Sequence, residues 1–180
     1  MRKRVSHLPE AHFSDHGSIR YMHLGTDWVQ GSMRINDPYG IHLEYVQRMM
    51  AGLLFTPLDE VPSQHAMQLG LGAAALTKFC HKHLHTRTTA IELNPQVIAA
   101  CRLWFRLPAD TARLSVILGD AVEVAHHPHC MVAMTSLSVV PALTRFSPTQ
   151  EMTLLMLAIA PMPSTRHTVS TGSTTKAISV

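Results

Sequence analysis

The sequence contains few charged residues for a soluble protein. Aspartate, glutamate, lysine and arginine make up 15% of its 180 residues, against about 25% in a typical globular chain. The net charge is +3, and the basic residues are scattered apart from the run Arg2-Lys3-Arg4 at the start. Proteins that bind nucleic acid concentrate lysine and arginine on one face or along one helix. We therefore expect no nucleic acid partner.

Long apolar runs and paired cysteines are also missing. The most apolar late run, residues 154–160, is far shorter than the roughly 20 residues that a membrane-spanning helix needs. The N-terminal MRKRV is followed by a polar stretch rather than by the apolar segment of a signal peptide. The three cysteines, Cys80, Cys101 and Cys130, have no paired spacing, which indicates reduced thiols. These absences favour a cytoplasmic protein without a membrane partner.

Two histidine-rich segments contain residue types that bind metals. They are CHKHLH, residues 80–85, and HHPHC, residues 126–130. A structural zinc site needs four ligands, usually from paired clusters. On a helix His81 and His85 share one face, but Cys80 points elsewhere. We interpret both segments as ordinary helix-end and loop histidines and predict no metal site.

The first third of the chain predicts a flexible start and then a small ribbon with a helix. Residues 1–16 show no periodicity and are predicted to be flexible. Residues 17–36 alternate apolar and polar positions around two glycines, which predicts two or three short antiparallel strands. In IHLEYVQRMMAGLLF, residues 41–55, helical spacing predicts one buried face formed by Leu43, Val46, Met50 and Leu54. Ribbon and helix together form a predicted unit over residues 17–62.

Residues 63–125 alternate between strand and helix patterns. Strands are expected at about 65–69, 88–93 and 114–118, with a helix over 73–84 between the first two. Asn94-Pro95 begins a second helix well, because asparagine caps a helix and proline suits its first position. This alternation predicts an α/β fold with a parallel, doubly wound sheet.

The composition changes after residue 125. Only four of the 55 residues from 126 to 180 are charged, and serine, threonine, proline and methionine are frequent. The end of the chain is expected to be partly disordered, and TQEMTLLMLAIA, residues 149–160, reads as one helix. No further strand–helix–strand unit is evident. We interpret residues 126–180 as a divergent or out-of-frame tail, which leaves the C-terminal half of the fold incomplete.

A glycine turn joins the first of these strands to its helix. Gly70 and Gly72 allow the backbone to turn tightly and to approach a ligand, with the amide groups of the next helix facing it. Glu92 ends the next strand, where an acid accepts hydrogen bonds from ribose hydroxyls, and Asp120 ends the third. The turn is compatible with a dinucleotide, an S-adenosylmethionine-type ligand or no ligand. The acid after the third strand favours the S-adenosylmethionine type.

From about Gly17 to Val124 the sequence resembles the spermidine synthase-like (polyamine aminopropyltransferase) family. The ribbon and the following HLEY segment are the most specific part of the likeness. MQLGLGAAALTKF resembles the glycine loop of that family, AIELNPQVIAACR its ribose-binding strand and helix, and VILGDA its adenine-side turn. The resemblance implies a Rossmann-like fold of the class I S-adenosylmethionine-dependent transferases with an N-terminal β-ribbon.

The resemblance also implies ligand contacts and substrates. Gln30 and His42 would contact the nucleoside or the aminopropyl end of the ligand, Glu92 its ribose and Asp120 its adenine. Gly70 and Gly72 would form the loop beneath it. S-adenosylmethionine or its decarboxylated form would be a co-substrate, no cofactor would be bound permanently, and a polyamine would be the second ligand.

Two departures from the family pattern affect catalysis. Ala73 occupies the position of an aspartate that would hold the cationic end of decarboxylated S-adenosylmethionine. The region that should supply a carboxylate base for the attacking amine is HHPHCMVAMTSLSVVPALTRF, residues 126–146, which contains no acid. We therefore name no catalytic residue.

Three hypotheses remain from the sequence. The first is an aminopropyl or methyl transferase with incomplete catalytic machinery. The second is a non-catalytic nucleoside-binding or interaction protein that retains the first half of the fold. The third is a nicotinamide-dependent oxidoreductase. The acceptor substrate and the oligomeric state are left open, with a homodimer among the options.

Overall fold

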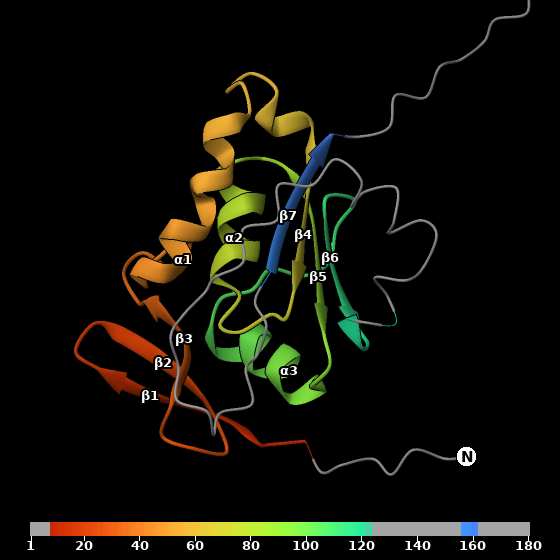
Figure 1. Cartoon of the computed structure of the whole chain (residues 1–180). Helices are drawn as coiled ribbons and strands as arrows, with labels where there is room; N and C mark the ends of the chain where they lie inside the picture. Colours follow the sequence, from red (N-terminus) through yellow and green to blue (C-terminus); the bar gives the residue numbers. More distant parts are fainter. Residues whose placement is uncertain (1–7, 122, 124–155, 162–180) are drawn as a thin grey trace, which may run out of the picture.

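The computed structural model describes residues 8–121, 123 and 156–161, which form two β-sheets and the helices between them (Figure 1). A three-stranded sheet has the order β1-β2-β3, and a four-stranded sheet has the order β6-β5-β4-β7. The predicted antiparallel ribbon is present, and three strands of the larger sheet, β6, β5 and β4, are parallel as predicted, whereas β7 is antiparallel to β4. The ribbon precedes the larger sheet in the chain and packs beside its helices.

The ribbon consists of β1 (Ala11–His16), β2 (Ile19–Leu24) and β3 (Val29–Arg34), all antiparallel. Met22 and Met33 point into the core, as expected from the alternating pattern. The prediction that residues 1–16 are flexible is wrong for β1. Ala11 and Phe13 pack against the core, and six residues of β1 pair with β2. Two apolar positions were too few to reveal the strand.

The helix predicted over residues 41–55 has two parts. It begins as α1 (Glu44–Met49) and continues as the 3₁₀-helix η1 (Met50–Phe55). Val46 and Met49 are buried, but the side chain of Leu54 is 85% exposed. The spacing that placed Leu54 on the buried face assumed 3.6 residues per turn, whereas a 3₁₀-helix has three. A second short 3₁₀-helix, η2 (Val61–Ser63), leads into the larger sheet.

The strand and helix rhythm of residues 63–125 is confirmed. It forms β4 (Gln64–Leu69), α2 (Ala75–Lys82), β5 (Arg87–Glu92), α3 (Pro95–Trp104) and β6 (Leu114–Leu118), and the three strands are parallel. Asn94 caps α3 as predicted, because its side-chain oxygen accepts a hydrogen bond from the backbone N–H of Gln96 at 2.9 Å.

One strand comes from the end of the chain. β7 (Met156–Pro161) pairs antiparallel with β4 at the edge of the sheet. The helix predicted for residues 149–160 is therefore wrong over residues 156–160. A short, wholly apolar run does not distinguish strand from helix, and pairing with the edge of β4 decides its conformation. The rest of the predicted divergent tail lies outside the described residues.

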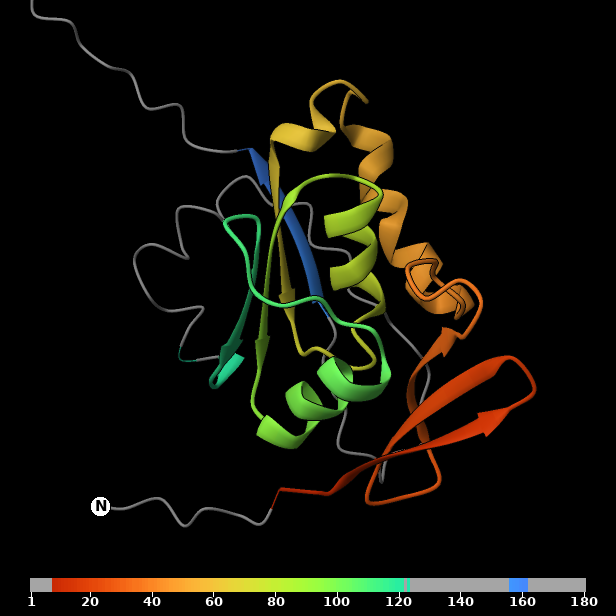
Figure 2. The ribbon, with the colours of Figure 1, turned by 180° about the vertical axis from the view of Figure 1, so that it is seen from behind.

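In the described part of the chain, the helices and the ribbon lie on the same side of the four-stranded sheet, as Figures 1 and 2 show from opposite directions. The described residues therefore cover one face of the sheet, whereas the predicted doubly wound arrangement requires that both faces be covered. One core cluster joins the ribbon to α3 and the sheet, around Met22, Phe105 and Leu114. A second joins α1 to α2, around Val46 and Leu76. Within the described part of the chain, no helix has the length and apolar character needed to cross a membrane.

Candidate functional site

The glycine turn between β4 and α2 has the backbone conformation that the sequence predicted. Gly70 has a φ of +81° and Gly72 a φ of +52°, a region that residues with a Cβ rarely adopt. The N–H of Gly70 donates to the carbonyl of Ile91 on β5 at 2.8 Å. The turn therefore lies at the carboxyl edge of the sheet, between the ends of β4 and β5.

Glu92 ends β5 and holds this turn with its carboxylate. One oxygen accepts a hydrogen bond from the N–H of Leu71 at 2.8 Å, and the other accepts one from the N–H of Asn94 at 2.9 Å. The residue is 8% exposed. A carboxylate has about four acceptor positions, so these two bonds leave capacity for hydroxyl groups of a ligand.

Gln68, on β4, also holds this turn with its side chain. Its side-chain nitrogen donates to the carbonyls of Gly70 and Leu71, at 2.7 and 3.2 Å. Its oxygen accepts from the hydroxyl of Thr77 on α2 at 2.5 Å. The N–H of Leu71 is thus bound by the side chain of Glu92, and its carbonyl by the side chain of Gln68.

Asp120 follows Gly119 in the turn that comes directly after β6. The preceding residue, Gly119, donates its N–H to the carbonyl of Glu92 at 2.9 Å. Parallel neighbouring strands end at the same edge of a sheet, so the turns that carry Glu92 and Asp120 are adjacent there. The three features that the sequence placed at this edge are brought together in the structure.

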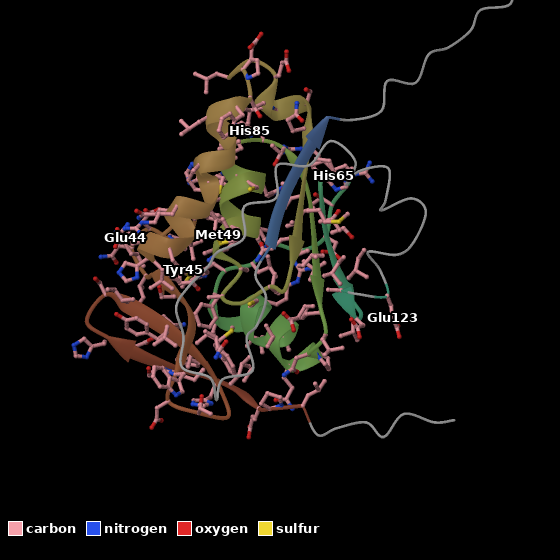
Figure 3. The ribbon with its side chains drawn as sticks, viewed as in Figure 1. Glu44, Tyr45, Met49, His65, His85 and Glu123 are labelled. Carbon is pink, nitrogen blue, oxygen red and sulfur yellow. The ribbon has the colours of Figure 1, made fainter. Side chains whose placement is uncertain are left out.

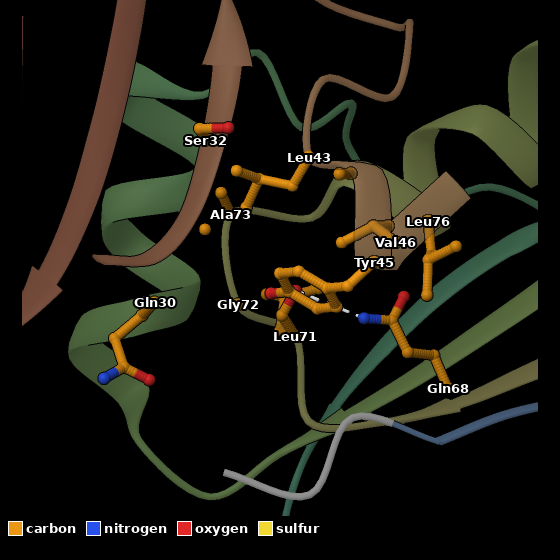
Figure 4. Close-up of a pocket in the computed structure, with 12 residues that line it drawn as sticks. Gln30, Ser32, Leu43, Tyr45, Val46, Gln68, Leu71, Gly72, Ala73 and Leu76 are labelled. Atoms are coloured by element: carbon orange, nitrogen blue, oxygen red, sulfur yellow. Dashed lines mark hydrogen bonds between the residues drawn. The ribbon is translucent and has the colours of Figure 1, made fainter. Parts of the chain in front are cut away.

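A small pocket borders the glycine turn where it meets β3 and α1 (Figure 4). Tyr45 extends from α1 toward Leu71 and Gly72, and burial raises the pKa of its hydroxyl. The pocket is lined by Gln30, Gly31, Ser32, Leu43, Tyr45, Val46, Gln68, Leu71, Gly72, Ala73, Ala75 and Leu76.

Gln30 and His42 approach this pocket in different ways. Gln30 lines it directly. His42 does not, but its Nδ1 forms a 2.8 Å hydrogen bond with the hydroxyl of Ser32, which does line the pocket. Burial, with a smaller effect of Arg34, lowers the pKa of His42. Of the residues predicted for the site, Gln30 and Gly72 therefore share the pocket, and His42 is one side chain away.

Ala73 packs against the ribbon. A Cβ placed on Gly31 of β3 would lie 2.7 Å from both the Cβ and the backbone nitrogen of Ala73. Ala73 is buried, 3% exposed, and belongs to the core cluster around Met22 and Phe105. The small side chains at these two positions allow β3 and the glycine turn to approach each other closely.

Two residues of the site were not found from the sequence. Tyr45 is one residue of the predicted helix over residues 41–55 and Gln68 one residue of the predicted strand at about 65–69, and neither is predicted as a site residue. A polar residue in the middle of the apolar strand HAMQL is a signal for Gln68, because a buried amide is costly unless its hydrogen bonds are made.

Neither of the buried cysteines described, Cys80 and Cys101, is paired, and burial raises the pKa of both thiols. In the part of the chain that the structure describes, no group of three or more His, Cys, Asp or Glu residues could hold a metal ion. HHPHC lies outside it.

The fold and the site define a Rossmann-like α/β protein with an N-terminal β-ribbon and a glycine turn at the carboxyl edge of its sheet. A solved structure agrees with this class: a probable spermidine synthase from Corynebacterium glutamicum superimposes with a TM-score of 0.51 at 15% identity. The superposition covers 68% of this chain and 47% of that one.

Curated relatives identify the family. Two polyamine aminopropyltransferases, from Neisseria meningitidis serogroups A and B, are 41% identical over 124 residues. A third, from Chromobacterium violaceum, is 34% identical over 124 residues. Over these residues the chain is homologous to polyamine aminopropyltransferases, which confirms the resemblance to the spermidine synthase-like family seen in the sequence. No protein-family model matches the sequence. The matches cover 68% of the chain, which spans about half the length of these relatives (46%).

Proposed function

We propose that the chain binds an adenosyl ligand, S-adenosylmethionine or its decarboxylated form, at the edge formed by the glycine turn, Glu92 and Asp120. The observation that carries the proposal is the carboxylate of Glu92. It is bound to the backbone of the turn and of the α3 cap, and it keeps acceptor positions for ribose hydroxyls. In this proposal Asp120 accepts a hydrogen bond from the adenine edge, and Gly70 and Gly72 let the backbone approach the ligand.

The reaction that we propose is aminopropyl transfer to a polyamine. The amine nitrogen of the acceptor forms a bond to the carbon next to the sulfonium of the decarboxylated co-substrate. The carbon–sulfur bond breaks, its electron pair stays on sulfur, and the new ammonium group loses a proton to a base. We assign no residue as that base. The pocket lined by Gln30, Tyr45 and Gly72 borders the turn, and in this proposal it receives the acceptor.

The decisive experiment is calorimetry of the full chain with four ligands. Decarboxylated S-adenosylmethionine, S-adenosylmethionine and methylthioadenosine should each release or absorb heat on binding, and NAD should give no comparable signal. Absence of binding by all three adenosyl compounds would exclude the proposal. Binding of NAD alone would indicate a nicotinamide-dependent enzyme instead.

The ribose assignment is tested by Glu92→Gln. An amide has one acceptor oxygen, so the variant loses charge-assisted bonds that are worth about 1.5–3 kcal/mol each. We expect affinity for the adenosyl ligands to fall by about tenfold or more. Glu44→Gln is the matched control, because Glu44 is an exposed acid on the outer side of α1, paired with Arg48 (Figure 3). Equal affinities of the two variants would show that the carboxylate of Glu92 does not contact the ligand.

A further inference from the structure

The side chain of Gln68 is fully used in holding one turn. It is 1% exposed on β4, and its nearest strand neighbours, Met67 and Leu69, are apolar. The two carbonyls that it faces only accept hydrogen bonds, so the amide nitrogen must point toward them and the amide oxygen toward the Thr77 hydroxyl. Both donors and the acceptor are therefore satisfied.

Burying an amide is unfavourable unless its hydrogen bonds are made. A methionine or leucine would fill the same space in the sheet without that requirement. The side-chain hydrogen bonds of Gln68 all end on the glycine turn or on the first turn of α2, and none of them reaches another part of the fold. Packing therefore does not explain why an amide occupies this position. The need to hold the glycine turn in one conformation does explain it.

The glycine turn is the part of the backbone that would contact the proposed ligand. The bonds to Gly70 and Leu71 draw two consecutive carbonyls toward the protein interior. The carbonyl of Leu71 also accepts from the N–H of Ala74 at 2.9 Å, at the residue where α2 is about to begin. With its carbonyls held inside, the turn presents no carbonyl of these two residues to an incoming ligand.

We propose that Gln68 is a positioning residue for ligand binding, which fixes the glycine turn in its binding conformation before the ligand arrives. This inference rests on the proposed adenosyl site. Gln68 acts through the backbone of Gly70 and Leu71 and need not touch the ligand. A free turn would lose conformational freedom on binding, and a turn that is already ordered does not, so affinity is higher.

The test compares Gln68→Met with Thr77→Val. Both variants break the buried network, but only the first releases the carbonyls of the turn. Affinity for methylthioadenosine, measured by calorimetry, should fall about tenfold in Gln68→Met and by less than about threefold in Thr77→Val, although both lower the melting temperature. Equal losses of affinity in the two variants, or wild-type affinity in Gln68→Met, would overturn the proposal.

Hydrogen exchange separates this proposal from the proposed function. The amides of residues 70–74 should exchange faster in Gln68→Met than in wild type or Thr77→Val, with no ligand present. If wild type binds no adenosyl compound but this difference is found, the site assignment fails while the ordering of the turn by Gln68 stands. If the exchange rates are equal, the positioning role is wrong whatever the ligand. Gln68→Glu, which keeps the acceptor for Thr77, replaces Gln68→Met if the latter does not fold.

Discussion

Replacing Lys78 by methionine should change how the stability of the protein depends on pH. Lys78 lies on α2 with a side chain that is 1% exposed, and its Nζ donates to the carbonyl of Phe105 at 2.7 Å. Burial lowers its pKa from 10.5 to about 8, against smaller opposing effects of Cys101 and Asp37. The folded state therefore binds the lysine proton less tightly than the unfolded state does.

The sign and size of the effect follow from proton linkage. Between the two pKa values the unfolded chain holds more protons, so the free energy of unfolding rises with pH in this range. Lowering the pKa from 10.5 to about 8 corresponds to about 3 kcal/mol. Below about pH 8, the free energy of unfolding is therefore smaller by this amount than it would be with a lysine of ordinary pKa. Between about pH 7 and pH 9.5 the wild type should recover about 2 kcal/mol of it.

Lys78→Met removes this titration and also one hydrogen bond. At pH 7 the gain of about 3 kcal/mol from not burying an ammonium group is offset by the unsatisfied Phe105 carbonyl, at about 1–3 kcal/mol. The two proteins should therefore have similar stabilities at pH 7, and the wild type should be the more stable at pH 9.5. Subtracting the two profiles cancels the other titrating groups that they share.

The assay is urea unfolding of both proteins at several pH values, followed by circular dichroism. Parallel profiles, or a wild-type advantage that shrinks as the pH rises, would refute the reasoning. If the variant does not fold, the titration of the Lys78 ε-carbon followed by NMR in the wild type provides the pKa directly. A value near 10.5 would then show that the ammonium group is not desolvated.

Two further predictions concern the packing around the site. Gly31→Ala brings a Cβ within 2.7 Å of Ala73. The free energy of unfolding should therefore fall by about 1–3 kcal/mol, and the melting temperature should fall with it. An unchanged melting temperature would mean that β3 and the glycine turn are not in contact. Asn94→Ala removes the cap of α3 and the bond from the Asn94 amide to the Pro9 carbonyl, so urea unfolding should show a loss of about 1–2 kcal/mol, while Asn94→Ser, which keeps a capping oxygen, should lose less. Equal losses in the two variants would show that the cap is not the source of the effect.

Much of the fold could be predicted because its signals are local. The Asn94-Pro95 pair marks the start of α3 by itself, and the alternation of strand and helix patterns predicted the parallel sheet. β1 and β7 were missed for the opposite reason, because neither has a strong pattern of its own and each is stabilised by a partner strand, β2 or β4. The predicted burial of Leu54 was wrong because no sequence pattern marks the change from α-helix to 3₁₀-helix after Met49.

The candidate site was predictable where topology alone brings residues together. Glu92 and the turn at Gly70 follow neighbouring parallel strands, so they had to lie at one edge. Gln68 and Tyr45 could not be found in the same way, since their roles depend on which carbonyls and which pocket they face. Those relations arise only when α1 and α2 pack onto the sheet.

The pairing of β7 with β4 also has a consequence for how the chain folds. Leu69 pairs with Met156, so two segments that are far apart in the sequence must meet before this ladder can form. The entropy of closing so long a loop makes distant pairings slow compared with local ones. During synthesis, β4, β5 and β6 emerge before Pro161 does, and in that interval the side of β4 that later pairs with β7 has no partner strand. This edge of β4 can then pair with a strand of a second copy of the chain. The yield of folded protein should therefore depend on a low concentration of such incomplete chains.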